Sequence, residues 1–373
     1  MARLFFLLSI PLAVLCQTID LPPPPTSNVF ITTFPITDYS RMDPLAPTKT
    51  PRRLMASLFQ PANCTKTQLI PYMPPATAAF HDSNFSSLGI PNGTFEALRL
   101  QVCPSAPKKT DFPLLLFSTG AGTSRLLYNV ICQWIASVGF NVVSIDHTYD
   151  ALVVEFPDGA IIPMGNKTLP DDSDEILKVR VADVHFVFNA LSNKTLTANA
   201  KIPQLKTKRV GMFGHSFGGA TAGGVMLVEP RVVGGLNMDG SMWGPALNKT
   251  QKNPFTIIAN RYHNQSDDAT WAAFWPQLKG MKLQLQVNGT EHGSFVDYPI
   301  LANSIGINSA VLPAIEPFIG DIEGLRMLKI LRTYIGGFFQ EVLESKKVKI
   351  LQGPSTQFPE VTFANSSFGA EAN

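Results

Sequence analysis

Residues 209–220 read RVGMFGHSFGGA. The apolar run that ends at Phe213 is typical of a buried strand, and the small residues after Phe217 let a helix pack close to a sheet. Between them lies G-x-S-x-G, whose glycines allow a sharp turn that leaves the hydroxyl of Ser216 clear of the sheet. The motif also fits an ordinary glycine-rich turn, but the flanking strand and helix favour Ser216 as a nucleophile.

A serine nucleophile needs a histidine to accept its proton and a carboxylate to orient that histidine. After this kind of turn the partners follow in the order serine, acid, histidine, each on a loop after a strand. Only His263 and His292 come after Ser216. His292 directly follows the last expected strand beside a glycine, whereas His263 comes early and stands next to a glycosylation acceptor. This order favours His292 as the base.

Two positions remain open for the acid. Asp239 follows an expected strand and begins a Gly-Ser turn, while Asp267 and Asp268 follow the next strand after a longer loop. Either loop can face the histidine. Each position also has a structural interpretation, since Asp239 fits a plain Asp-Gly turn and the Asp267-Asp268 pair fits a helix N-terminus.

The oxyanion of such a reaction needs two backbone N–H donors. Phe217 is expected to supply one, and Ala121 in the loop TGAG at residues 119–122 the other. That loop also resembles part of a dinucleotide-binding pattern, with Asp146 after the next strand. Arg125 stands where the pattern requires its third glycine, and a secreted enzyme would meet little nicotinamide cofactor, so we expect no cofactor.

Apolar stretches with strand and helix periodicity alternate along the chain. Strands are expected near residues 53–59, 97–102, 113–118, 140–145, 209–213, 232–238, 255–259 and 281–287, and helices near 124–138, 174–191, from 217 onward and 324–343. This alternation predicts an α/β fold with a mostly parallel twisted sheet and helices on both faces.

The chain has 373 residues, of which 45% are apolar and 16% charged, and its 30 Lys and Arg nearly balance 28 Asp and Glu. This composition excludes a disordered protein, and the lack of long basic runs argues against nucleic acid as a partner. Residues 1–16 have the basic start, apolar run and cleavage site of a signal peptide, and no later stretch is long enough for a transmembrane segment. We expect a secreted, extracellular protein with a loosely attached Pro/Thr/Ser-rich arm at 17–50 and one catalytic domain at 51–373.

Glycosylation acceptors of the form N-x-[ST] support secretion, because they are more frequent than chance would give. They lie at Asn63, Asn84, Asn92, Asn166, Asn193, Asn248, Asn264, Asn288 and Asn365. Beyond the signal peptide three cysteines remain, an odd number for an oxidising compartment. Cys64 and Cys103 flank one segment and are expected to pair, whereas Cys132 lies in an apolar helical stripe and is expected to be buried and free.

The other histidines favour structural roles. His81 lies in a polar loop, His185 in a helix, and His215 points away from the base position if Ser216 is the nucleophile. His147 follows a strand at the expected edge of the site and is expected to support the pocket. The sequence contains no HExxH or C-x-x-C motif, so no catalytic metal is expected.

Seven motifs are spread over most of the chain after residue 16: RMDP at 41–44, RRLM at 52–55, FSTGAG at 117–122, DHTYD at 146–150, FPDG at 156–159, RVAD at 180–183 and GHSFGGA at 214–220. Together these motifs resemble the platelet-activating factor acetylhydrolase family, specifically the lipoprotein-associated type and its secreted fungal members. One departure is Thr119, which replaces the histidine of the family's usual Ser-His-Gly; the expected donor is a backbone group and is retained.

The resemblance implies an α/β-hydrolase that cleaves acetyl or other short acyl esters from the sn-2 position of glycerophospholipids without calcium, a 1-alkyl-2-acetylglycerophosphocholine esterase. It also implies Asp239 as the acid, because the family's acid follows the strand after the nucleophile helix, and it maps the base onto His292. A cutinase-like polyester or small-ester hydrolase is the first alternative. A catalytically silent binding protein is the second alternative. A silent protein would be expected to lack a triad residue, whereas all three triad positions are occupied here. The apolar residues 299–320 fit core packing best, and otherwise a substrate pocket or lipid contact.

Overall fold

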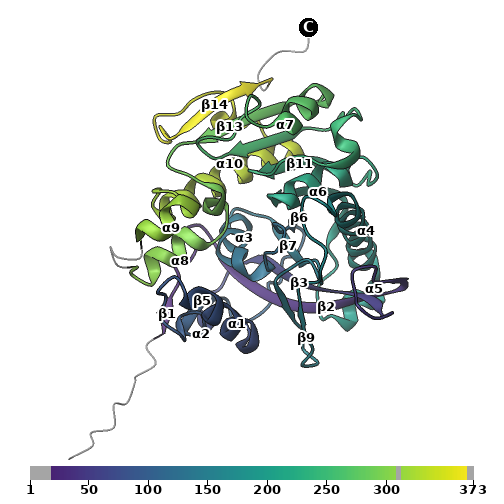
Figure 1. The fold of residues 1–373 in the computed structure, drawn as a ribbon, viewed down its shortest axis with the longest axis vertical. Coiled ribbons are helices and arrows are strands. Elements are labelled where there is room, and N and C mark those ends of the chain that lie inside the picture. Colours follow the sequence, from purple (N-terminus) through teal and green to yellow (C-terminus); the bar gives the residue numbers. More distant parts are fainter. Residues whose placement is uncertain (1–17, 308–311, 368–373) are drawn as a thin grey trace, which may run out of the picture.

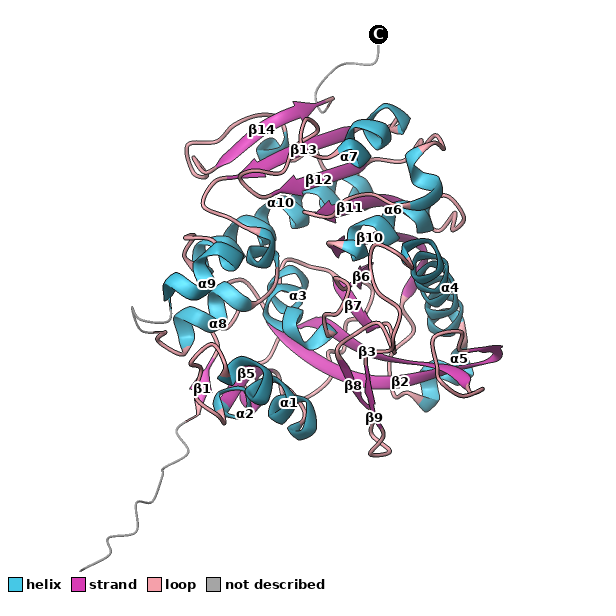
Figure 2. Ribbon diagram, viewed as in Figure 1, coloured by secondary structure: helices cyan, strands magenta, loops and turns pink. Residues whose placement is uncertain are grey.

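A nine-stranded sheet forms the centre of the computed structural model, which describes residues 18–307 and 312–367 (Figures 1 and 2). Across the sheet the strands are β14 (Val361–Ser366), β13 (Lys282–Val287), β12 (Phe255–Ala259), β11 (Val232–Met238), β10 (Lys206–His215), β6 (Pro113–Ser118), β7 (Asn141–Asp146), β3 (Pro51–Ala62) and β2 (Asn28–Met42). The run from β13 to β7 is parallel, and β14, β3 and β2 pair antiparallel with their neighbours. The predicted α/β class with a mostly parallel sheet is confirmed.

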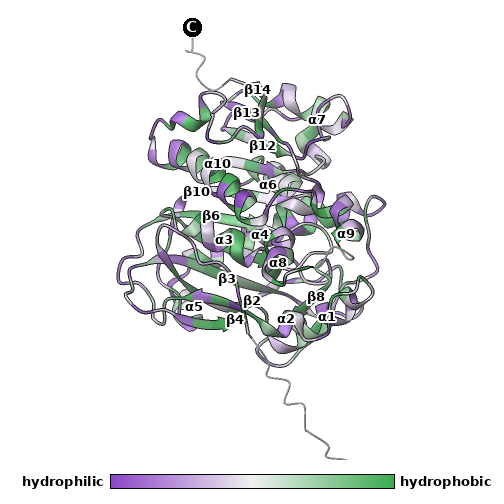
Figure 3. Cartoon of the chain, turned by 90° about the vertical axis from the view of Figure 1, so that its left-hand side faces the viewer, coloured by the Kyte–Doolittle hydropathy of each residue, from purple (hydrophilic) through white to green (hydrophobic). Residues whose placement is uncertain are grey.

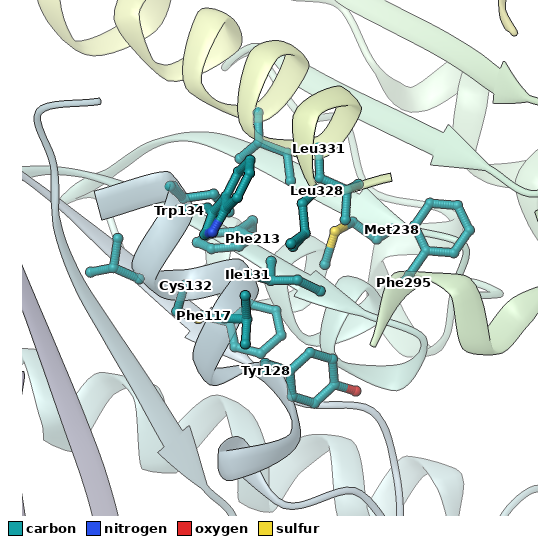
Figure 4. Packing of buried hydrophobic residues seen from close by; sticks show 14 of the residues in the cluster. Phe117, Tyr128, Ile131, Cys132, Trp134, Phe213, Met238, Phe295, Leu328 and Leu331 are labelled. Atoms are coloured by element: carbon teal, nitrogen blue, oxygen red, sulfur yellow. The ribbon is translucent and has the colours of Figure 1, made fainter. Parts of the chain in front are cut away.

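The sheet is buried on both faces, as β6 illustrates. Leu115 and Phe117 belong to the cluster beneath α3 (Asn129–Ala136) and α10 (Gly324–Glu344), part of which is drawn in Figure 4. Leu114 and Leu116 belong instead to the cluster beneath α4 (Ser173–Ser192) and α6 (Phe217–Met226). Side chains alternate between faces along a strand, so an uninterrupted apolar run requires helices on both sides. Figure 3 shows this hydrophobic character along β6.

The register of the parallel strands aligns their carboxyl ends at one edge. Ser118 at the end of β6 pairs with Ile145 of β7 and Gly214 of β10, and His215 of β10 pairs with Met238 of β11. Residues that follow these strands therefore emerge next to one another. In open α/β sheets this edge is where ligands bind.

The N-terminal part of the chain differs from the prediction. The expectation of a loose arm over residues 17–50 is wrong for Asn28–Met42, which form β2 and pair with β3 over most of their length. Val29, Phe34 and Ile36 are buried, while their neighbours include Thr, Pro and Ser that resemble a linker. Pro35 is tolerated because β2 is an edge strand.

The remaining elements surround this sheet. A small sheet contains β1 (Ile19–Asp20), β5 (Leu98–Val102) and β4 (Gln68–Pro71), and a hairpin contains β8 (Val153–Glu155) and β9 (Ile161–Pro163). The further helices are α1 (Pro75–Ser86), α2 (Thr94–Ala97), α5 (Lys194–Asn199), α7 (Ala269–Phe274), α8 (Tyr298–Ser304) and α9 (Leu312–Ile319). Short 3-10 turns are η1 (Arg125–Tyr128), η2 (Gly244–Leu247), η3 (Trp275–Gln277), η4 (His292–Phe295) and η5 (Lys349–Leu351).

The three cysteines after residue 16 have the predicted states. Cys64 and Cys103 form a disulfide with their Cα atoms 5.9 Å apart, and Cys132 is free and buried in α3, as predicted. The expected signal peptide, residues 1–16, lies outside the described residues. Within 18–307 and 312–367, no helix has the length and apolar character needed to cross a membrane.

Candidate active site

Ser216 occupies a strained turn between β10 and α6. Its backbone angles are φ 55° and ψ −125°, a conformation that L-residues adopt rarely. The glycines around it are needed for space, since a Cβ on Gly214 would lie 2.3 Å from the backbone of Gly218. A Cβ on Gly218 would lie 2.0 Å from the carbonyl oxygen of Ser118. The turn therefore brings Ser216 to the carboxyl edge of the sheet against the loop after β6.

Asp239 and His292 meet at the same edge. Asp239 directly follows β11, and His292 begins η4 after β13. The Nδ1 atom of His292 lies 2.7 Å from Oδ2 of Asp239, whose side chain is fully buried, while the His292 side chain is 44% exposed. Burial by itself raises the pKa of Asp239, but hydrogen bonds from His263 and His292 outweigh it and hold the pKa well below its ordinary value. A carboxylate thus remains ionised behind a histidine that faces solvent.

His215 links the serine turn to His292. The two imidazole rings are 4.6 Å apart, and Nε2 of His215 donates to the carbonyl oxygen of His292 at 3.1 Å. Its Nδ1 therefore accepts from the hydroxyl of Tyr128 at 2.8 Å, and that oxygen accepts from the N–H of Gly120 at 3.1 Å. Burial, and then the neighbouring His292, lower the pKa of His215 well below its usual value. A neutral His215 therefore connects the loop after β6 to the backbone of His292.

Arg180 of α4 fixes the loop after β6 from below. It is buried, pairs with both carboxylate oxygens of Asp150, and donates to the carbonyls of Thr119 at 2.5 Å and Gly120 at 3.2 Å. In a planar trans peptide the carbonyl and the next N–H point in opposite directions. With the Gly120 carbonyl held by Arg180, the N–H of Ala121 points the other way.

The two expected oxyanion donors are near each other. Ala121 packs against the cluster that contains Phe217. Phe217 is the first residue of α6, where a helical N–H has no partner within its own helix. Ala121 and Phe217 therefore pack in the same cluster, and the N–H of Phe217 has no acceptor within its own helix.

Ser118 and His147 belong to a buried support beneath the loop. Ser118 Oγ lies 2.9 Å from Nε2 of His147, and Nδ1 of His147 lies 2.9 Å from Asp183, which also pairs with Arg52. These side chains are fully buried, so this second Ser-His-Asp arrangement has no access to substrate. Burial, and then Arg180, lower the pKa of His147 and keep its ring neutral.

Several sequence candidates occupy structural positions. Asp146 is fully buried against Arg125 and accepts from its backbone N–H, so it has no free carboxylate for a nucleotide ribose. Asp268 caps α7 by accepting from Thr270 N at 2.7 Å, and Asp267 accepts a hydrogen bond from Asn264. The helix N-terminal interpretation therefore holds for Asp268.

An apolar cavity of about 370 Å³ adjoins the site between α8, α9 and α2. Its lining includes Phe85, Phe95, Tyr298, Leu301, Ile315 and Phe318. Phe318 links this cavity to the residue after His292, because a Cβ on Gly293 would lie 2.7 Å from the Phe318 ring. Leu301, Ile315 and Phe318 belong to residues 299–320, for which core packing was the favoured interpretation, and they line this apolar cavity. Among the described residues, no cluster of three or more His, Cys, Asp or Glu side chains is arranged to hold a metal ion.

The sequence interpretation missed Arg180 and His263 as members of the site. Arg180 could be recognised because it is a charge on the apolar side of the helix expected over residues 174–191. The sequence offered only the early position of His263, which argued against it as the base. The loop between β12 and α7 brings His263 to Asp239. Such loop paths are not encoded by periodicity.

The structure is similar to that of a ferulic acid esterase from Streptomyces cinnamoneus. The two superpose with a TM-score of 0.79 at 29% sequence identity, covering 94% of this chain and 100% of that chain. Together with the arrangement of strands and the turn at Ser216, this likeness defines an α/β-hydrolase of the esterase class.

Sequence relatives narrow the class to a family. The family model described as platelet-activating factor acetylhydrolase, isoform II, matches residues 92–155 and 176–342. The chain is 33% identical over 358 residues to a probable 1-alkyl-2-acetylglycerophosphocholine esterase of Arthroderma benhamiae, covering 88% of this chain and 89% of that protein. It is 25% identical over 228 residues to a platelet-activating factor acetylhydrolase of Cavia porcellus, covering 54% and 52%. The chain belongs to the platelet-activating factor acetylhydrolase isoform II family of carboxylic ester hydrolases, which confirms the resemblance seen in its motifs.

Proposed function

We propose that the chain is a serine esterase in which Ser216 is the nucleophile, His292 the general base and Asp239 the orienting acid. The observation that carries the proposal is the 2.7 Å contact between Asp239 and His292 on loops beside the strained Ser216 turn. His215 directly precedes Ser216, and its ring lies 4.6 Å from the His292 ring, which supports a close approach of Ser216 to His292. Asp239 is favoured over Asp267, whose hydrogen-bond partner is Asn264.

In this mechanism Ser216 Oγ attacks the ester carbonyl while Nε2 of His292 takes its proton. Asp239 accepts from Nδ1 of His292 and stabilises the imidazolium. The N–H groups of Phe217 and Ala121 stabilise the oxyanion. The alcohol leaves with the proton from His292, and water then hydrolyses the acyl-serine by the same route in reverse.

The proposed substrate is the sn-2 acetyl or short acyl ester of a glycerophospholipid, after the name of the Arthroderma benhamiae relative. The apolar cavity beside His292 supports a lipid ester, because burial of alkyl groups there is favourable. The likeness to a ferulic acid esterase favours a second candidate, hydrolysis of small esters. No cofactor is needed for either reaction.

We further propose that residues 1–16 are removed as a signal peptide and that the remaining chain is secreted as one catalytic domain. The Cys64–Cys103 disulfide supports an oxidising compartment. Of the nine acceptor asparagines only Asn264 is half-buried, and the other eight are exposed. Endoglycosidase treatment of the secreted protein should increase its electrophoretic mobility, and an unchanged mobility would argue against this route.

The substrate assignment is tested with purified protein in a metal chelator. We expect release of acetate from 2-acetyl-glycerophosphocholine, slower reaction with a long sn-2 acyl chain, and no reaction by Ser216→Ala. Hydrolysis of p-nitrophenyl acetate without phospholipid hydrolysis would select the small-ester candidate. Full activity in Ser216→Ala would contradict the mechanism.

A further inference from the structure

A second histidine is held in the site between two carboxylates. His263 lies on the loop between β12 and α7, with its side chain 17% exposed. Its Nδ1 lies 3.0 Å from Oδ1 of Asp239, and its Nε2 lies 2.8 Å from Oδ2 of Asp268. Asp239 is therefore shared, with one oxygen facing His263 and the other facing His292.

This geometry determines the charge of His263. A neutral imidazole has one N–H, so one ring nitrogen would direct its lone pair at a carboxylate. Both contacts are satisfied only when both nitrogens carry a proton. The ring also stacks on Trp271 at 3.8 Å, a favourable position for a cation. Burial lowers the pKa of His263, but the hydrogen bonds and charges of Asp239 and Asp268 outweigh it and raise the pKa to about 9.

The partner Asp268 is itself rigidly held. Its Oδ1 accepts from the backbone and hydroxyl of Thr270, and its Oδ2 accepts from Ser241 at 2.6 Å as well as from His263. Trp271, beneath the His263 ring, donates to the Gly240 carbonyl at 2.7 Å and is fully buried. The far side of His263 is thus fixed by the N-terminus of α7.

The other ionisable groups near His263 have partners of their own. Asp239 faces His292 and lies near the neutral His215. Arg261, on the same loop as His263, pairs with Glu291 and approaches Asp321 at 3.5 Å. The ionisable groups that touch His263 itself are Asp239 and Asp268, from two different elements.

We propose that His263, held as a cation by Asp268, is a positioning residue that fixes the second carboxylate oxygen of Asp239 and balances part of its charge. This inference rests on the proposed roles of Asp239 and His292. With His263 protonated, the group of Asp268, His263 and Asp239 carries one net negative charge; with His263 neutral it carries two. The cation therefore reduces the negative charge beside His292. Because a nearby negative charge stabilises a protonated imidazole, this reduction should extend catalytic activity to lower pH.

The test compares the pH dependence of kcat/KM in the wild type, His263→Gln and Asp268→Asn. We expect the acid limb of His263→Gln to move to higher pH by about half to one unit, with a plateau kcat about threefold to tenfold lower and KM little changed. In Asp268→Asn the group keeps one net negative charge when His263 becomes neutral, as in the wild type, so its acid limb should move less than that of His263→Gln. His185→Gln is the matched control, because His185 also contacts a carboxylate, Glu229 at 2.8 Å, on the exposed side of α4.

The outcomes separate this inference from the proposed function. If Ser216→Ala is inactive but His263→Gln has the wild-type pH profile, His263 has no positioning role. If Ser216→Ala is active, the proposed function fails first. The ¹⁵N chemical shifts of the His263 ring provide a second test, in which two protonated nitrogens near pH 7 are expected and a neutral tautomer would overturn the inference.

Discussion

At Asp239 one carboxylate receives hydrogen bonds from three residues. Asn260 donates from its backbone at 2.8 Å and from its side chain at 2.9 Å, and His263 and His292 each approach one oxygen. The residue itself has φ 56°, a conformation that Asp tolerates better than most residues. The Asp-Gly turn interpretation and the proposed acid role are therefore compatible at the same residue.

Replacing Asp239 by Asn should lower kcat by about 10²- to 10⁴-fold, because the amide no longer selects the tautomer of His292 that accepts the serine proton. Asp267→Asn is the matched control and should keep near wild-type kcat, since Asp267 contacts Asn264 on the surface. Steady-state kinetics on a soluble ester measures both. A collapse of kcat in Asp267→Asn alone would contradict the assignment.

At the scale of elements, periodicity predicted most of the sheet and little of the edges. The apolar runs of β6, β11 and β12 are found at the predicted residues, because a doubly covered strand requires an uninterrupted apolar sequence. The edge strand β2 has one partner and tolerates Thr, Ser and Pro35, so its sequence resembled a linker. For the site, the Ser216 turn is a local feature and was predictable, whereas the path of the His263 loop depends on tertiary contacts.

The loop after β6 is held by α4 through Arg180, which leads to a prediction. Arg180→Lys keeps the charge but loses the planar fork that contacts Asp150 and two carbonyls. We expect kcat to fall about tenfold to 100-fold with KM changed by less than about threefold, as for a misplaced oxyanion donor.

The matched control for Arg180→Lys is Arg326→Lys. Arg326 also binds a carboxylate with two nitrogens, those contacts being to Glu360, and donates to a carbonyl, that of Gln357. It lies on α10 rather than beneath the loop after β6. Equal losses of kcat in the two variants, or no loss in Arg180→Lys, would show that Arg180 does not act through the loop.

The hydrogen bonds of His263 to Asp239 and Asp268 form a bridge between the end of β11 and the start of α7. This bridge should make the stability of the fold depend on pH. Folding raises the pKa of His263 to about 9, so its contribution is fully present below its ordinary pKa of 6.5 and is lost as pH rises through about 9. Between about pH 6 and pH 10 the wild type should lose about 3 kcal/mol of unfolding free energy relative to His263→Gln. Urea unfolding at several pH values measures this difference. Parallel pH dependences of the two proteins would argue against the bridge.

At the scale of the whole molecule, the Cys64–Cys103 disulfide joins the end of the β3 segment to the end of the β5 segment across 39 residues. A loop of this length predicts a stabilisation of about 3 to 4 kcal/mol. The double variant Cys64→Ser/Cys103→Ser should unfold at a correspondingly lower urea concentration while keeping its esterase activity under native conditions. Unchanged stability would show that the sheet and its helices suffice without this link.

The central claim is that the acyl group passes through Ser216, and trapping the acyl-enzyme tests it most directly. The protein is mixed with p-nitrophenyl acetate, quenched in acid within the first turnover and digested for mass spectrometry. We predict one acetyl group on the peptide that contains Ser216, none on that peptide in Ser216→Ala, and longer persistence of the acetyl group when Asp239 is replaced by Asn. An acetyl group on another residue, or turnover by Ser216→Ala, would contradict the account.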